Sequence, residues 1–173
     1  MSYSKIILKP KKAIVTERKH PFIFSGAIEK MQGHIADGDI VEVFNYRQEY
    51  LATGHFQKKN SISVRLFSFQ QAVCDLDFWA NKIAKAWEYR QQMGFTTKNT
   101  YTNAFRLINA EGDGMPGLIA DFYDGVLVLQ CHSLGMYKLR ELLVQAFRQV
   151  MGDKLQAIYD KSADLVRKVS DGD

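Results

Sequence analysis

Basic and aromatic residues lie close together near the start of the chain, where they could bind nucleic acid. The segment Pro21–Gly26 contains Phe22 and Phe24 and follows six basic residues, namely Lys9, Lys11, Lys12, Arg18, Lys19 and His20. Cationic side chains pair with phosphates, and exposed aromatic rings stack on unpaired bases. The two phenylalanines could instead belong to a hydrophobic core, and composition favours this interpretation for at least one of them.

The charge distribution points to the same part of the chain. The net charge is +4 over 173 residues. Residues 1–70 carry 11 Lys and Arg against 6 Asp and Glu, a net of +5, whereas residues 71–173 carry 12 against 13, a net of −1. Such asymmetry indicates a polyanionic partner for the first part. An ordinary solvated surface with a moderate excess of lysines would give the same numbers.

A glycine-rich segment at residues 111–117, Glu-Gly-Asp-Gly-Met-Pro-Gly, could bind a nucleotide or S-adenosylmethionine. A phosphate-binding loop must follow a strand and open a helix, so that the helix N-terminus faces the phosphate. Residues 118–123 instead alternate like a strand, and Pro116 favours a rigid turn. We therefore expect a structural turn here rather than a cofactor loop.

Other chemically reactive residues have no spacing that indicates catalysis or metal binding. Four carboxylates cluster in sequence at Glu111, Asp113, Asp121 and Asp124. Asp113 and Asp124 are residues that commonly occur in turns. The sequence gives no sign that two of the four carboxylates are held together for general acid–base catalysis. Cys131 and His132 are adjacent on a strand and would point to opposite faces. The four histidines form no ligand spacing typical of a metal site. We expect no catalytic, cofactor or metal site in this chain.

The first 70 residues show the short alternating patterns of β-strands. Strands are predicted at residues 6–8, 40–44, 50–57 and 61–69. Their close spacing is typical of a small β-barrel or sandwich.

From residue 75 onwards the pattern becomes mixed. A helix is predicted at 75–93, with Asp75 as N-cap and Gly94 as its stop. Strands follow at 105–109, 118–123 and 126–132, the last two joined by the hairpin signal Asp124-Gly125. A second helix, capped by Ser133, is predicted at 134–151 and a final strand at 155–159. The order α-β-β-β-α-β makes the chain an α+β protein.

Composition sets the broad class of the protein. The two cysteines form no disulfide framework. No apolar run reaches the roughly 18 to 20 residues of a membrane helix, and no signal-peptide core is present at the start. A soluble, reduced, cytoplasmic protein with no membrane partner is the expectation.

Three segments resemble a known family. Residues 18–28, 106–123 and 157–168 are similar to parts of a group of bacterial class I S-adenosylmethionine-dependent methyltransferases. The first resembles the opening of their PUA-type RNA-binding domain, and the other two resemble their central domain. Characterised members methylate cytosine C5 in large-subunit ribosomal RNA.

The resemblance implies a domain organisation. Residues 1–71 would form a PUA-like RNA-binding domain and residues 72–173 a central α+β domain. A Rossmann-like catalytic domain, which binds S-adenosylmethionine in the family, would follow residue 173. The donor loop, the Asp-Pro-Pro segment and the catalytic cysteine of that domain are not found in this sequence. The resemblance therefore implies an RNA-binding part that is inactive by itself and holds no cofactor.

The resemblance also indicates which residues would contact RNA. Those matching the opening motif are Lys19, His20, Phe22, Ser25 and Gly26. Lys58, Lys59 and Arg65 are added by charge alone. The glycines of residues 112–117 are expected to be architectural. Ribosomal RNA is the implied partner.

Two alternatives stay open. The chain could be a stand-alone RNA-binding or assembly module without methyltransferase activity, and the exposed edge of the strand at 155–159 could mediate a homodimer. It could also be a complete enzyme that uses Glu111, Asp113 and the glycine-rich turn as a nucleotide site. We expect no donor-binding geometry there.

Overall fold

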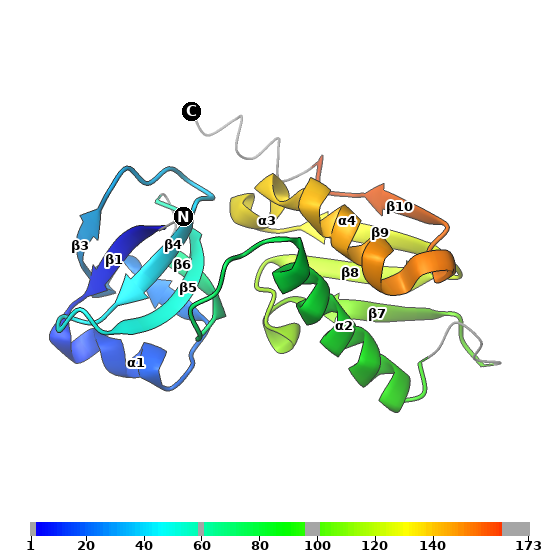
Figure 1. Cartoon of the computed structure of the whole chain (residues 1–173), viewed down its shortest axis with the longest axis horizontal. Coiled ribbons are helices and arrows are strands. Elements are labelled where there is room, and N and C mark those ends of the chain that lie inside the picture. The colour runs from blue at the N-terminus through cyan, green and yellow to red at the C-terminus, as the bar shows by residue number, and fades with distance from the viewer. Residues whose placement is uncertain (1–2, 59–60, 96–100, 164–173) are drawn as a thin grey trace. The chain divides into compact units, whose positions relative to one another are not determined.

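The structure is a computed structural model that describes residues 3–58, 61–95 and 101–163 (Figure 1). The chain separates into two compact units, with the division between Val73 and Cys74. We call them unit 1 and unit 2. No helix in the described ranges is both long and apolar enough to cross a lipid bilayer.

Unit 1 is built on a curled six-stranded sheet with the strand order β2-β6-β5-β4-β1-β3. Strand β1 pairs with β4 in parallel, and the remaining pairs are antiparallel. The strands are β1 (Ser4–Leu8), β2 (Phe22–Phe24), β3 (Ile28–Gln32), β4 (Ile40–Phe44), β5 (Tyr50–Phe56) and β6 (Ile62–Ser68). The short helical elements are η1 (Pro10–Lys12), α1 (Ala13–Glu17) and η2 (Ser25–Ala27).

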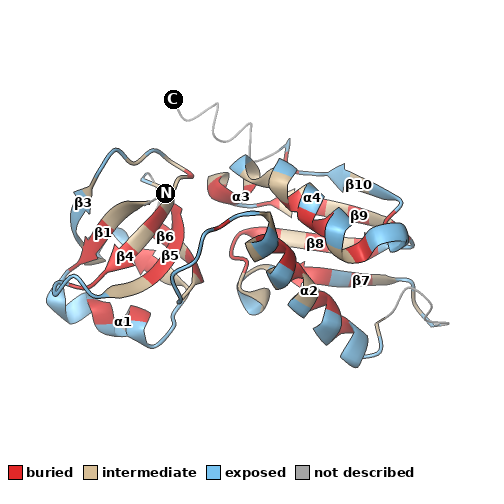
Figure 2. Cartoon of the chain, viewed as in Figure 1, coloured by how far each residue is buried: buried red, intermediate tan, exposed pale blue. Residues whose placement is uncertain are grey.

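Two strands and one helix of unit 1 have no counterpart in the sequence-based prediction. Strand β2 has only three residues, too few to show an alternating pattern. Strand β3 is largely exposed, so it lacks the regular apolar positions that indicate a strand. The other four strands lie where the sequence predicts them. The core lies inside the curl of the sheet and includes Ile6, Val43, Val64 and Leu66 (Figure 2).

Unit 2 is a four-stranded sheet with the order β10-β9-β8-β7. Strands β7, β8 and β9 are antiparallel, and β10 pairs with β9 in parallel. Helices α2 and α4 pack beside each other on one face of this sheet (Figure 1). The elements are α2 (Leu76–Gln92), β7 (Ala104–Asn109), η3 (Ala110–Asp113), β8 (Leu118–Tyr123), β9 (Val126–Cys131), α3 (Leu134–Lys138), α4 (Arg140–Met151), η4 (Gly152–Lys154) and β10 (Ala157–Asp160).

The predicted order α-β-β-β-α-β is confirmed, with one correction. The second helix is two helices, because α3 ends at Lys138 and α4 begins at Arg140, with Leu139 between them at φ −87° and ψ −1°. The predicted caps are confirmed: Asp75 accepts a hydrogen bond from the Phe78 N–H at 3.0 Å. At the β8–β9 hairpin Asp124 and Gly125 both have positive φ, 43° and 90°, as such a turn requires.

Candidate nucleic-acid interface

A pocket of about 290 Å³ opens in unit 1 between α1 and the β2–η2 segment. Of the eight residues predicted to contact RNA, three line it, namely His20, Phe22 and Gly26. Lys12, Thr16 and Phe24 also line it and were not in the predicted set. The pocket therefore brings together basic, hydroxyl and aromatic groups from η1, α1, the turn after α1 and β2.

The turn after α1 sets the position of His20 at this pocket. Lys19 has a φ of 61° and donates its N–H to the Thr16 carbonyl at 2.8 Å, which reverses the chain. The next residue, His20, accepts a hydrogen bond from the Phe22 N–H at its Nδ1, at 3.2 Å. The two rings meet edge to face, with centroids 5.7 Å apart. Lys19 itself is exposed and does not line the pocket.

Strand β2 divides its three residues between the core and the surface. Ile23 is 2% exposed and belongs to the core, whereas Phe24 is 51% exposed and Phe22 is half-buried. The expectation that at least one of the two phenylalanines is a core residue is therefore wrong. Successive residues of a strand face opposite sides, so Ile23 takes the inward position. An exposed Phe24 remains available for stacking.

Ser25 and Gly26 form the next turn, η2, and both are exposed. The Lys9 ammonium donates to the Gly26 carbonyl at 3.0 Å, and the Ser25 N–H donates to the Ser61 carbonyl at 3.0 Å. A side chain added at Gly26 would meet no atom within 4 Å. The glycine leaves this rim of the pocket open rather than relieving a clash.

The residues chosen by charge alone are placed elsewhere in unit 1. Lys58 lies in the segment after β5, where its N–H donates to Asp37 at 2.6 Å, and its side chain is exposed. Arg65 lies on β6 opposite Phe22 and is half-buried. Lys59 falls outside the described residues. Neither Lys58 nor Arg65 lines the pocket.

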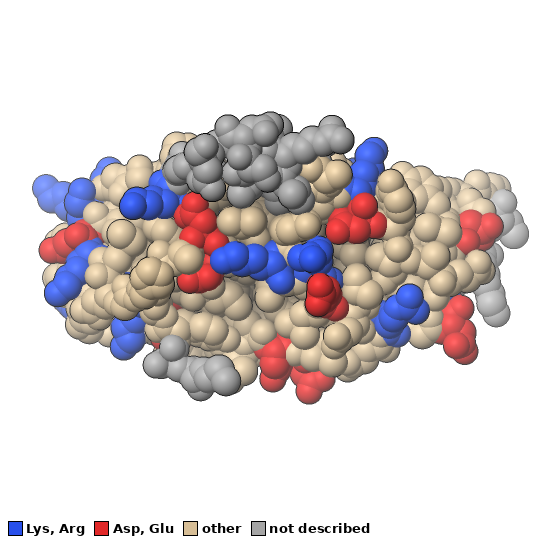
Figure 3. Space-filling model, turned by 90° about the horizontal axis from the view of Figure 1, so that it is seen from above, with Lys and Arg blue, Asp and Glu red and all other residues tan. Residues whose placement is uncertain are grey.

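The basic residues of this region are concentrated locally. Lys11, Lys12, Arg18 and Lys19 follow one another through η1, α1 and the next turn, and all are exposed. On the face drawn in Figure 3, Lys and Arg side chains are interspersed with Asp and Glu instead of merging into one patch.

The glycine-rich segment of unit 2 has the geometry of a structural turn, as predicted. It leaves β7 through η3 and enters β8, which is antiparallel to β7, so it opens no helix. Gly114 and Gly117 have φ of 65° and 84°. A Cβ at Gly117 would lie 2.5 Å from the Ser133 Oγ. Because the turn leads from one strand into the next and not into a helix, it lacks the loop-to-helix arrangement of a phosphate-binding loop.

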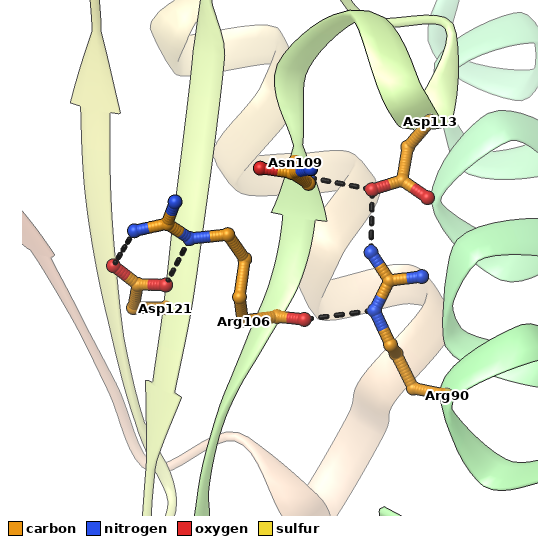
Figure 4. Close-up of polar contacts among 5 residues, drawn as sticks. All are labelled: Arg90, Arg106, Asn109, Asp113 and Asp121. Atoms are coloured by element: carbon orange, nitrogen blue, oxygen red, sulfur yellow. Dashed lines mark hydrogen bonds and ion pairs between the residues drawn. The ribbon is translucent and has the colours of Figure 1, made fainter. Parts of the chain in front are cut away.

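Asp113 has a role that turn chemistry does not account for. Its carboxylate forms an ion pair with Arg90 of α2 at 2.6 Å, and both side chains are about nine-tenths buried (Figure 4). The Asn109 N–H donates to the same carboxylate. In addition, the Lys82 ammonium donates to the Gly114 carbonyl at 3.0 Å, and burial lowers the pKa of Lys82. The turn is thus held to α2 by two cationic side chains.

The thiol of Cys131, a further reactive group of unit 2, is buried. Burial raises the pKa of the Cys131 thiol to about 11, which keeps it protonated and unreactive at neutral pH. Within the described ranges, no group of three His, Cys, Asp or Glu residues could hold a metal ion.

Comparison with protein families identifies unit 1. Residues 6–69 match the family described as the PUA-like domain. This range includes five of the six strands of unit 1 in full and most of β1. The α+β architecture and the PUA-like domain expected from the sequence are thereby confirmed.

Curated relatives match nearly the whole chain. The chain is 34% identical over 166 residues to Ribosomal RNA large subunit methyltransferase I of Alteromonas mediterranea, covering 95% of the chain and 41% of the relative. It is 37% identical over 152 residues to the protein of the same name from Aeromonas hydrophila, covering 87% of the chain and 37% of the relative. The chain thus spans about two fifths of the length of the curated relatives it matches.

A solved structure has the same fold. A protein from Streptococcus mutans assigned as a SAM-dependent methyltransferase superposes with a TM-score of 0.74 at 20% identity, covering 93% of this chain and 41% of that chain. A second match, described as a methyltransferase complexed with SAH, gives a TM-score of 0.74 at 21% identity, covering 92% and 40%. At this level of identity, the likeness concerns the fold.

Proposed function

We propose that this chain, which is homologous to the N-terminal region of ribosomal RNA large subunit methyltransferases, binds structured ribosomal RNA through unit 1 and delivers it for methylation of a cytosine at C5. The observation that carries the proposal is Phe24, half exposed at the mouth of a pocket that Lys12 also lines. A cation beside an accessible ring is the combination that binds a phosphate and stacks on its base.

The residues that line the pocket, and those next to them in the chain, have distinct parts in this proposal. Lys12 and Lys19 neutralise backbone phosphates, and the Phe24 ring stacks on an unpaired base. His20 and Phe22 form the wall behind that base, since their edge-to-face contact fixes both rings. Ser25 and Gly26 supply an open rim along which the backbone passes. Lys58, Lys59 and Arg65 extend the basic surface as a secondary contact.

The methyl donor lies outside the part of the molecule that binds RNA in this proposal. S-adenosylmethionine supplies the methyl group in this class of enzyme. In the relatives, we propose, a region beyond the matched two fifths holds the donor. The residues of this chain bind and orient RNA but transfer no group. We also propose a cytoplasmic location, because ribosomal RNA is the proposed substrate.

Salt-dependent RNA binding tests the proposal. Fluorescence anisotropy with structured fragments of large-subunit ribosomal RNA should give a linear fall of log K with log salt. Lys12→Gln and Lys19→Gln should each reduce the slope by about 1. Phe24→Ala should weaken binding by about 1–3 kcal/mol at unchanged slope.

Lys154→Gln is the matched control, because Lys154 is an exposed lysine of unit 2. It should leave both affinity and slope unchanged. Absence of binding at low salt would refute the proposal. Equal effects of all three lysine variants would refute the assignment of the site to the α1–β2 pocket.

One observation favours a second candidate function, assembly of two copies. Strand β10 forms an edge of the unit 2 sheet and is mostly exposed, with Tyr159 61% exposed. Such an edge can pair with a strand of another chain. Sedimentation velocity over a range of concentrations tests this alternative, which a strictly monomeric protein would rule out.

A further inference from the structure

We infer that a second pocket, in unit 2, receives one unpaired base of the RNA that unit 1 binds. The inference rests on the proposed function but concerns separate residues. The pocket has a volume of about 400 Å³ and lies between the second half of α2 and the β7–η3 segment. This volume is within the range of pockets that hold small organic groups.

Aromatic rings make up the floor of this pocket. Phe105 is 9% exposed and stacks on Trp87, with ring centroids 5.8 Å apart and an interplanar angle of 19°. Phe95 lies against Phe105 at 5.8 Å in a tilted arrangement. Because Phe105 is buried between other rings, the floor is rigid. Phe105 itself offers no open face, so the ring that a planar base would stack on is the partly buried Phe95.

The outer wall comes from one face of helix α2. Tyr89 and Met93 are four residues apart, so they lie above one another on the helix, and each is 55% exposed. With the aromatic floor, they form a slot that is apolar on two sides.

Charge in this pocket argues against a phosphate as its occupant. Arg90 donates to Asp113 at 2.6 Å and to the Arg106 carbonyl at 2.8 Å. The Arg106 guanidinium is directed to the other side of β7, where it pairs with Asp121 (Figure 4). Both arginines of the lining are therefore neutralised by a carboxylate. A neutral, planar group complements this environment better than an anion does.

A polar group at the rim could recognise the edge of a base. Asn109, the last residue of β7, is exposed, and its amide offers two donors and one acceptor. Gly112 lies directly beside it, since an added Cβ would come within 3.3 Å of the Asn109 Nδ2. The absence of a side chain at Gly112 leaves this amide space to turn towards a ligand.

The test uses the full chain and an oligoadenylate of about ten nucleotides that carries 2-aminopurine as a fluorescent base. Binding should quench the fluorescence by stacking. Tyr89→Ala, together with Gly112→Leu, should reduce the affinity about tenfold to a hundredfold. The slope of log K against log salt should stay unchanged, because no phosphate contact is removed.

Tyr123→Ala is the matched control, because Tyr123 is a tyrosine of unit 2 that is 50% exposed and lies outside the pocket. If Tyr89→Ala and Gly112→Leu behave like this control while Lys12→Gln still lowers the salt slope, the pocket inference is wrong and the proposed function stands. If the unaltered chain binds no RNA, the proposed function fails and the inference falls with it.

A direct binding measurement on the unaltered protein distinguishes the pocket inference from the proposed function even when a variant does not fold. Titration with free adenosine, which carries no phosphate, should shift the side-chain amide resonance of Asn109 in the unaltered protein. Shifts confined to unit 1, or none at all, would overturn the inference.

Discussion

Arg90 of helix α2 and Asp113 of η3 are joined by a buried ion pair across 23 positions of sequence, with 2.6 Å between Nη2 and Oδ2. The same guanidinium donates through Nε to the Arg106 carbonyl at 2.8 Å. One side chain therefore fixes the helix to both the strand β7 and the turn that leaves it. This contact shapes the floor and rim of the unit 2 pocket.

Removing one partner of this pair should destabilise unit 2 strongly. In Asp113→Asn the buried guanidinium loses its counter-charge, and we expect a loss of about 3–5 kcal/mol in the free energy of unfolding. Asp121→Asn breaks the Arg106–Asp121 pair, whose side chains are 47% and 24% exposed, and should cost less than about 1 kcal/mol. Urea denaturation measures the free energy of unfolding of both variants. Equal losses would show that burial does not determine how much the Arg90–Asp113 pair contributes to stability.

Replacing Gly117 should destabilise the protein more than replacing Gly94, which has a similar φ angle, because Gly117 is in close contact with Ser133. Gly94 and Gly117 have φ of 87° and 84°, but only Gly117 has neighbours within reach of a Cβ. Ser133 cannot easily move, because it caps α3. We expect Gly94→Ala to cost about 1 kcal/mol and Gly117→Ala about 3 kcal/mol or more. Similar unfolding midpoints for both variants would contradict the clash.

The buried thiol of Cys131 should make stability fall at alkaline pH. Its pKa is raised from 9.0 to about 11 by burial, so the folded state retains a proton that the unfolded state releases. Below pH 9 the raised pKa contributes about 2–3 kcal/mol to the free energy of unfolding. This contribution declines as the pH rises from 9 to 11.

The pH dependence is measured as the difference between the original protein and Cys131→Ala. The subtraction cancels the opposite effect of Lys82, whose pKa is lowered by burial. The difference in the free energy of unfolding should be constant below pH 9 and shrink above it. A constant difference up to pH 11 would contradict a raised pKa.

The N-cap of α2 should contribute independently of packing. Asp75 is exposed, and its carboxylate accepts the Phe78 N–H at 3.0 Å. Asp75→Ala should cost about 1 kcal/mol, whereas Asp75→Asn should retain most of the stability because it keeps the acceptor oxygen. Thermal unfolding compares the three proteins, and an unchanged melting temperature in Asp75→Ala would refute the cap.

Local sequence signals determined much of the architecture. The Asp124-Gly125 pair predicted the β8–β9 hairpin because few other residues tolerate two successive positive φ angles. Asp75 predicted the start of α2, because its side chain replaces a missing backbone partner within four residues. The strands of the first unit with regular alternation were also predicted, whereas β2 and β3 were too short or too exposed to show it.

The candidate sites depended on contacts between residues far apart in sequence. The basic and aromatic segment was recognised from its residue types. Only the pairing of β2 with β6 turns Ile23 inward and leaves Phe24 exposed. The sequence offered Asp113 as a turn residue, and only folding brought Arg90 against it. Side-chain type and short-range backbone preference are properties of the sequence alone. Burial, ion pairing and pocket shape arise when distant segments pack together, and for that reason the tertiary structure alone decided them.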